Sequence, residues 1–121
     1  MVRRIYVEKK EEFSSQAKDL KKEIGSYLGI KSVDKLRILI RYDVENVSDE
    51  VFKKAERIVF SEPPVDVLYE GSFPHDESDK VFSVEALPGQ FDQRADSAMQ
   101  CVRFIDEDQD PIIQTAVTYC L

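Results

Sequence analysis

An internal repeat constrains the fold of this chain more than any other feature of its sequence. In two segments, five apolar residues recur at spacings of four, three, four and three, which place side chains on one face of a helix. The second set lies 78 positions after the first, member by member. The first set is Phe13, Ala17, Leu20, Ile24 and Tyr27, and the second is Phe91, Ala95, Ala98, Val102 and Ile105. We therefore expect two copies of one helical unit.

Alternating apolar residues flank each helical segment, as in strands that bury one face. They repeat at an offset of 77, so one inserted residue before the helix and one deleted residue after it reconcile the two offsets. They are Ile5, Val7, Leu36, Ile38, Ile40 and Tyr42 in the first copy, and Phe82, Val84, Ile113, Thr115, Val117 and Tyr119 in the second. The duplicated strand, helix, strand unit predicts an α+β fold of ferredoxin-like type, with a mainly antiparallel sheet and its helices on one face.

Two further details follow from the first copy. Gly29 is a plausible end for its helix, since glycine tolerates the left-handed conformation found at helix ends. In the following strand Leu39 alternates with the apolar positions and stands between Arg37 and Arg41, on the side that the pattern assigns to solvent.

The first copy continues beyond its second strand, whereas the second copy does not. Ser48 and the two acidic residues after it predict the start of a helix, because a hydroxyl caps free amides and carboxylates favour the positive end. Pro63 and Pro64 forbid its continuation, and residues 65–69 then form a strand. Without a counterpart of this helix and strand, part of the sheet should lie bare and the chain should self-associate, and Leu121 is expected to lie within a longer protein. We expect residues 1–71 to form the first unit, 72–79 a loop, and 80–121 a partial, truncated second unit.

The segment from Leu87 to Ala98 is the most unusual one, because it gathers polar groups at a turn from a strand into a helix. Free amides at a helix start can bind an anion, although Asp92 can itself occupy that position as a cap. Both interpretations remain open, and a contact surface for another domain is a further one. The candidate residues are Gly89, Gln90, Asp92, Gln93, Arg94, Asp96 and Ser97.

Residue sets for catalysis are missing from the sequence. His75 is the one histidine and stands in a polar stretch, so neither a Cys-His pair nor a Ser-His-Asp triad has its base nearby. Cys101 and Cys120 are expected to be buried free thiols, and their spacing does not resemble a metal site. The four glycines are too far apart for a phosphate-binding loop. We expect no catalytic residue, no metal and no cofactor in this segment.

The charge balance argues against nucleic acid as a partner. Acidic residues number 24 and basic ones 17, giving a net charge of −7 that a phosphate backbone would repel. The sequence also has no apolar run of the length that spans a bilayer, and no apolar stretch follows Met1. A cytoplasmic protein without a membrane partner is therefore expected.

Four segments of the chain carry a resemblance to a known family. They are RRIYVEKK (3–10), RYDVE (41–45), VFSEPPVD (59–66) and LPGQFDQRADSA (87–98). In this order they resemble the start of the large single-chain phosphoribosylformylglycinamidine (FGAM) synthases of clostridia and their relatives. The last segment also resembles a diverged Pro-Gly, Ala-Thr-Asp, Cys pattern near the start of other large FGAM synthases, with Cys101 at the matching cysteine.

The resemblance implies a bridging role in purine biosynthesis. In that family the amino-terminal region resembles a fused pair of PurS subunits, which helps dock the glutaminase to the synthetase and supports ammonia transfer between them. ATP and magnesium are then expected only in the synthetase domains, and the catalytic triad only in the glutaminase, so this segment alone is expected not to be an enzyme. The whole enzyme would convert formylglycinamide ribonucleotide, glutamine and ATP into FGAM, glutamate, ADP and phosphate.

Two other functions remain open from the residues alone. A duplicated strand, helix, strand unit hosts many unrelated functions, so a free-standing ferredoxin-like domain that binds a ligand or regulates a partner is the main alternative. A small enzyme that uses the turn from Gln90 to Ser97 is the third, and the missing nucleophile and metal ligands weigh against it.

Overall fold

The chain folds as a five-stranded antiparallel sheet with helices, which confirms the predicted α+β class. The computed structural model describes residues 2–27 and 36–121. Within these residues the strand order is β3-β1-β2-β5-β4, and every neighbouring pair is antiparallel. The strands are β1 (Arg3–Lys9), β2 (Arg37–Glu45), β3 (Asp66–Glu70), β4 (Val81–Glu85) and β5 (Ile112–Cys120); the helices are α1 (Ser15–Tyr27), α2 (Asp49–Ile58) and α3 (Gln93–Ile105), and a 3₁₀ turn, η1, spans Glu11–Phe13.

The pairing of the strands follows the offset seen in the sequence. Ile5 pairs with Tyr42, and Phe82 pairs with Tyr119, so both members of the second pair stand 77 positions after those of the first. In the middle of the sheet Ile40 pairs with Val117, its own counterpart at the same offset. The helices α1 and α3 each span 13 residues and begin 78 positions apart. These registers favour the duplication, which stays a prediction.

The main core lies between the sheet and two of the helices, α2 and α3. The buried residues Val51, Phe52 and Ala55 of α2 and Ala95, Ala98 and Val102 of α3 pack on the strand residues Ile5, Val7, Tyr42, Val44 and Ile113. Ser48 caps α2 as predicted, because its side chain accepts a hydrogen bond from the amide of Val51 at 3.3 Å. The predicted apolar stripe of α3 is therefore correct at Ala95, Ala98 and Val102.

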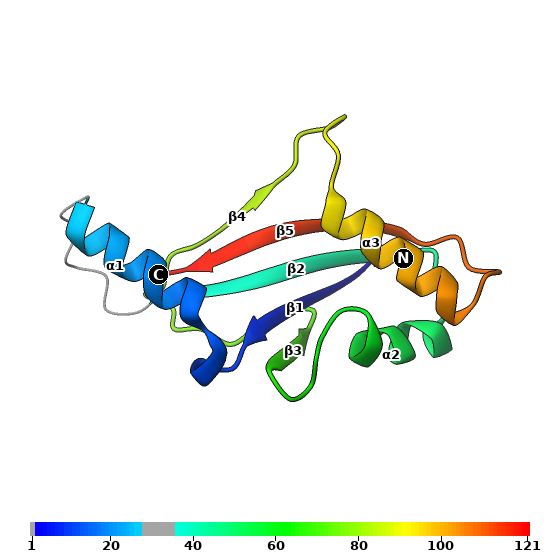
Figure 1. The fold of residues 1–121 in the computed structure, drawn as a ribbon, viewed down its shortest axis with the longest axis horizontal. Helices are drawn as coiled ribbons and strands as arrows, with labels where there is room; N and C mark the ends of the chain where they lie inside the picture. The colour runs from blue at the N-terminus through cyan, green and yellow to red at the C-terminus, as the bar shows by residue number, and fades with distance from the viewer. Residues whose placement is uncertain (1, 28–35) are drawn as a thin grey trace.

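The helix α1 covers the other end of the same sheet face (Figure 1). Ala17 is buried and lines a cavity with Ile38 and Ile40, so all three helices lie on one side, as predicted. Phe13 does not belong to this buried stripe: it lies in η1, before α1 begins, and is 46% exposed. Its amide donates to the carbonyl of Lys10 at 2.8 Å within this 3₁₀ turn, so the helix and its buried stripe begin after Phe13. The expected helix end at Gly29 falls outside the described residues.

The second face of the sheet is also covered, which the strand pattern did not predict. Leu39 is fully buried there and packs with Phe73 and Cys120, beside Tyr6 and Tyr69. Phe73 comes from the segment between β3 and β4, so this loop covers part of the second face of the sheet. The placement of Leu39 on a solvent face is therefore wrong, because one aromatic residue of an otherwise polar loop covers it.

Arg37 fastens this loop to the sheet. Its guanidinium donates two hydrogen bonds of 2.7 Å to the carboxylate of Glu8 and a third, also of 2.7 Å, to the carbonyl of Pro74. It also lies 5.3 Å from the ring centre of Phe73. The bonds to Glu8 hold the pKa of Arg37 above its usual value. Bidentate pairing of this kind fixes geometry as well as charge, so the loop is held in one place.

None of the helices within residues 2–27 and 36–121 has both the length and the hydropathy needed to cross a membrane.

Candidate functional site

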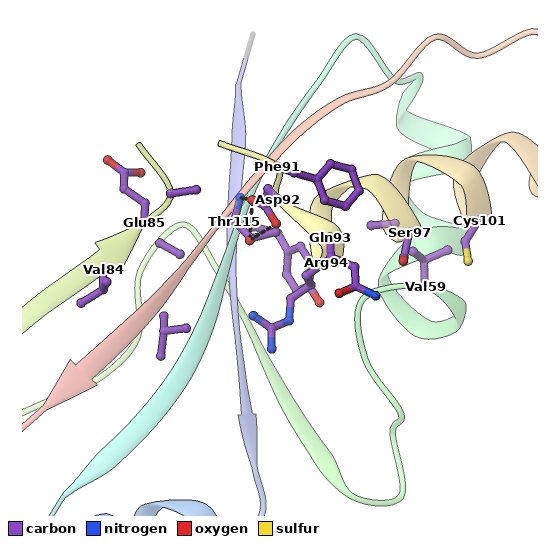
Figure 2. A pocket seen from close by; sticks show the side chains of 15 residues that line it. Val59, Val84, Glu85, Phe91, Asp92, Gln93, Arg94, Ser97, Cys101 and Thr115 are labelled. Atoms are coloured by element: carbon purple, nitrogen blue, oxygen red, sulfur yellow. Dashed lines mark hydrogen bonds between the residues drawn. The ribbon is translucent and has the colours of Figure 1, made fainter. Parts of the chain in front are cut away.

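An open groove of about 790 Å³ lies between α3 and the exposed part of the sheet face that the helices cover. Figure 2 shows its wall, with the side chains of Arg94, Ser97 and Cys101 on α3 and those of Val84 and Glu85 on β4. Residues of strands β2, β4 and β5 also line it, together with Val59. The lining residues are Tyr42, Val59, Val84, Glu85, Ala86, Phe91, Asp92, Gln93, Arg94, Ser97, Ala98, Cys101, Thr115, Ala116 and Val117.

Asp92 joins the start of α3 to the neighbouring strand. One carboxylate oxygen accepts a hydrogen bond from the amide of Ala95 at 2.9 Å, which makes Asp92 the cap of the helix. The same carboxylate accepts from the amide of Thr115 at 3.1 Å and from its hydroxyl at 2.8 Å (Figure 2). Burial by itself raises the pKa of Asp92, but these hydrogen bonds to the charged form outweigh it, so the pKa lies below its usual value.

Arg94 brings a positive charge into the groove. Its side chain extends from α3 towards the strands (Figure 2), and Tyr42 lines the groove beside it. Burial raises the pKa of the Tyr42 hydroxyl, and the charge of Arg94 acts against this rise. The groove thus combines an apolar floor with a guanidinium and a phenol, an arrangement that can hold an apolar group carrying a hydrogen-bond acceptor.

The Arg94→Met variant should raise the pKa of Tyr42 further above 10.0, the ordinary tyrosine value. The sign follows from the cation, which stabilises the phenolate; without it, burial and the charges of Asp66 and Asp92 all favour the neutral phenol. The measurement is a titration of ¹³C-labelled tyrosine by NMR. Arg103→Met, which removes the same charge further along α3, should leave the pKa of Tyr42 where it was. An unchanged or lowered value in Arg94→Met would contradict the geometry.

The groove brings together four of the seven residues that the sequence singled out. Asp92, Gln93, Arg94 and Ser97 line it. The other three lie elsewhere: Gly89 has a positive φ of 88° in the turn, Gln90 accepts from the amide of Leu87 at 2.7 Å, and Asp96 accepts from the Gln100 amide at 2.9 Å. Since Asp92 occupies the amide of Ala95, the turn is built as a capped helix start. Its role as an interface or anion site stays a prediction.

Several lining residues were not singled out from the sequence, although a signal existed for some of them. Tyr42, Val84 and Val117 belong to the alternating positions that face the helices, so they were expected on this side of the sheet. Cys101 stands seven positions after Arg94 and four after Ser97, which places the three on one side of α3. Thr115 could be linked to Asp92 only through the fold, because 23 residues separate them.

Two sequence expectations about this region are wrong. Cys101 was expected to be a buried thiol, and it is exposed, because it lies beside the buried positions Ala98 and Val102 and not among them. Phe91 was expected on the buried stripe of the helix, and it is 74% exposed. It stands immediately before the Asp92 cap and therefore belongs to the turn. Cys120 is buried, as expected, and its thiol donates to Asp79 at 3.5 Å.

The described residues do not assemble a nucleophile with a base in this groove. His75 is exposed, and its ring lies 5.2 Å from that of Phe73 on the loop side of the sheet, whereas Cys101 lies on the helix side. Among the described residues no group of three or more histidine, cysteine or acidic side chains is placed to hold a metal ion. What the groove does offer is apolar contact and the charge of Arg94, which are means of binding.

Comparisons of the chain with protein-family models, with curated proteins and with solved structures found no match.

Proposed function

We propose that the chain is an assembly domain of an FGAM synthase in the cytoplasm, which helps dock the glutaminase to the synthetase for ammonia transfer. The proposal takes the family from the resemblance of the four sequence segments. It assigns no reaction to the chain itself, because ATP and magnesium would be bound by the synthetase domains and glutamine by the glutaminase.

The observation that carries the proposal is the amount of exposed apolar surface. Large exposed apolar side chains occur on β4 and in the segment between β4 and α3; they are Phe82, Val84, Leu87 and Phe91. Two more, Ile58 at 71% and Phe104 at 92% exposed, lie at the C-terminal ends of α2 and α3. Exposed apolar groups of this size mark sites of contact with other proteins. A domain that docks two neighbours requires two such surfaces.

The test uses the synthetase part and the glutaminase part of an FGAM synthase without its PurS-like region, prepared as separate proteins. The binding of this chain to each part is measured. Isothermal titration should detect binding of the chain to at least one of them. Phe104→Ser should weaken that binding by about tenfold or more, since a buried aromatic anchor contributes 2 kcal/mol or more to an interface. Lys54→Ser, on the exposed side of α2, is the matched control and should bind as the wild type does. Absence of binding to both parts would refute the assignment.

The groove itself favours a second candidate, a free-standing domain that binds a small ligand. Its volume of about 790 Å³ lies in the ordinary range of ligand pockets, and Arg94 supplies a specific charge. On this account amphipathic carboxylates should raise the melting temperature of the chain, and the rise should vanish in Arg94→Met. If these ligands do not change the melting temperature and the chain binds the synthetase or the glutaminase part, the result favours the assembly domain over the ligand-binding domain.

A further inference from the structure

A second cavity, of about 590 Å³, lies at the end of the sheet where β1 ends and β2 begins, beside the first half of α1. Residues of β1, β2, β3 and α1 line it, and none of them belongs to the groove that contains Arg94. The two hollows are therefore separate sites. The second cavity also shares no residue with the exposed apolar surfaces to which we assign docking.

The charge around this cavity is opposite in sign to that of the whole chain, which has 24 acidic and 17 basic residues. Lys18 and Lys21 stand three positions apart on one face of α1, and the fold brings them beside Lys9 and Lys10 at the end of β1. Among the described residues that line the cavity, basic side chains outnumber acidic ones by five to two: Lys9, Lys10, Lys18, Lys21 and Arg37 against Glu8 and Glu11. Such a local excess of positive charge attracts anions.

Two of the five cations are already neutralised within the chain. Arg37 donates two hydrogen bonds of 2.7 Å to the carboxylate of Glu8, and the ammonium of Lys9 lies 3.0 Å from the carboxylate of Asp66. The Arg37 pair uses one of the two acidic side chains of the lining. Glu11 is therefore the one lining carboxylate, among the described residues, that could offset the other lysines.

Lys10 and Lys18 keep their charge. Lys18 donates to the backbone carbonyl of Glu11 at 3.0 Å, and a neutral acceptor of this kind does not cancel the ammonium charge. Within residues 2–27 and 36–121, neither Lys10 nor Lys18 forms an ion pair with a carboxylate. An ammonium group has three donors, so both side chains can donate to a bound anion.

The rest of the lining is suited to an organic group. Ala17 and Leu36 are buried, and Ile38 and Val67 add further apolar surface. The hydroxyl of Tyr69 donates to Glu8 at 3.3 Å, which helps hold its ring at the cavity. Apolar walls with a few polar groups are typical of small-molecule sites, and the volume lies in their ordinary range.

We propose that this cavity binds a small phosphate ester. Lys10, from the segment after β1, and Lys18, from α1, bind the phosphate group, and the organic part of the ester packs on the apolar wall beside Tyr69. A phosphate monoester carries about two negative charges at neutral pH, so one phosphate can pair with both ammonium groups, whereas a carboxylate has a single charge. Lysine binds phosphate as a point charge and does not require the paired geometry of arginine.

The test is a titration of the ¹⁵N-labelled chain with phenyl phosphate, followed by NMR. Saturable changes in amide shifts should occur at the cavity, for example at Lys18 and Val67, and not in the groove at Ser97 and Thr115. Inorganic phosphate, which lacks the ring, and phenyl sulfate, which carries less charge, should affect the same amides with weaker binding. Added salt should weaken the binding of all three anions.

Matched lysine variants separate the cavity from the general charge of the chain. Lys10→Gln and Lys18→Gln should each raise the dissociation constant for phenyl phosphate, and together they should raise it by about tenfold or more. Lys22→Gln, on α1 but outside the lining, changes the net charge equally and should bind as the wild type does. Arg94→Met should also leave this dissociation constant unchanged. Circular dichroism shows whether each variant is folded.

Three results would overturn the proposal: no saturable change at the cavity, changes centred on the groove, or an equal loss of binding in Lys22→Gln and Lys18→Gln. The titration uses neither synthetase nor glutaminase, so it can fail while the proposed assembly role stands.

Discussion

Leu39→Ala is expected to lower the free energy of unfolding by about 2–5 kcal/mol, the largest effect that we expect from a single substitution. Leu39 has no exposed surface and is enclosed by Phe73 and Cys120 on the loop side of the sheet. Shortening it removes buried methyl groups and leaves a cavity that the hydrogen-bonded sheet cannot close. Urea unfolding followed by circular dichroism measures the change, with the slope of the transition as a check on two-state behaviour.

Two controls make this result specific to the covered face. Leu39→Met keeps the volume and should cost less than about 1.5 kcal/mol. Phe104→Ala removes a larger side chain that is 92% exposed, and it should change stability by no more than about 0.5 kcal/mol. If Leu39→Ala changed the free energy of unfolding as little as Phe104→Ala does, the result would contradict the packing of the Phe73 loop on the sheet.

Asp92→Ala should lower the free energy of unfolding by about 2–4 kcal/mol. A helix cap contributes roughly 0.5–2 kcal/mol, and a buried amide left without its acceptor costs about 1–3 kcal/mol. Both apply here, because the carboxylate serves Ala95 and Thr115 together. Thr115→Val should lower the free energy of unfolding by less than Asp92→Ala does, because it removes only the hydroxyl and the amide of residue 115 still donates to Asp92. If Asp92→Ala cost no more than Thr115→Val, Asp92 would not join the helix to the strand.

The same carboxylate predicts a dependence on pH. The folded-state pKa of Asp92 is lowered, so its contribution to stability is fully present above the unfolded value of about 3.9 and is lost as the pH falls through the folded value. Asp92→Asn keeps one acceptor and carries no charge. The difference in stability between wild type and Asp92→Asn should therefore be constant near neutral pH and shrink in acid. A difference that grew in acid would contradict the lowered pKa.

Local chemistry explains what could be predicted from the sequence. The caps at Ser48 and Asp92 were recognisable because each polar side chain stands just before an amphipathic run, and both side chains accept from the amide three residues later. The alternation from Ile38 to Tyr42 likewise placed the helix side of the sheet. These patterns depend only on residues that are close in sequence, so long-range contacts do not change the structure that they predict.

The features that were missed depend on contacts distant in sequence. The burial of Leu39 requires Phe73, more than 30 residues away, and the polar composition of that loop gave no sign that it would cover a sheet. Cys101 was placed inside because cysteine is usually buried, although its position beside the helix stripe favours exposure. The groove joins α3 to three strands, and only the pairing of β5 with both β2 and β4 brings these together.

The most direct test of the proposed assembly role is the coupling of glutamine hydrolysis to FGAM formation. Synthetase and glutaminase parts of an FGAM synthase without its PurS-like region are assayed together, with and without this chain, and glutamate, free ammonia and FGAM are measured. With the chain present, FGAM should rise in step with glutamate and little ammonia should escape, whereas Phe104→Ser should restore the leak. Equal coupling with and without the chain would contradict the assembly role.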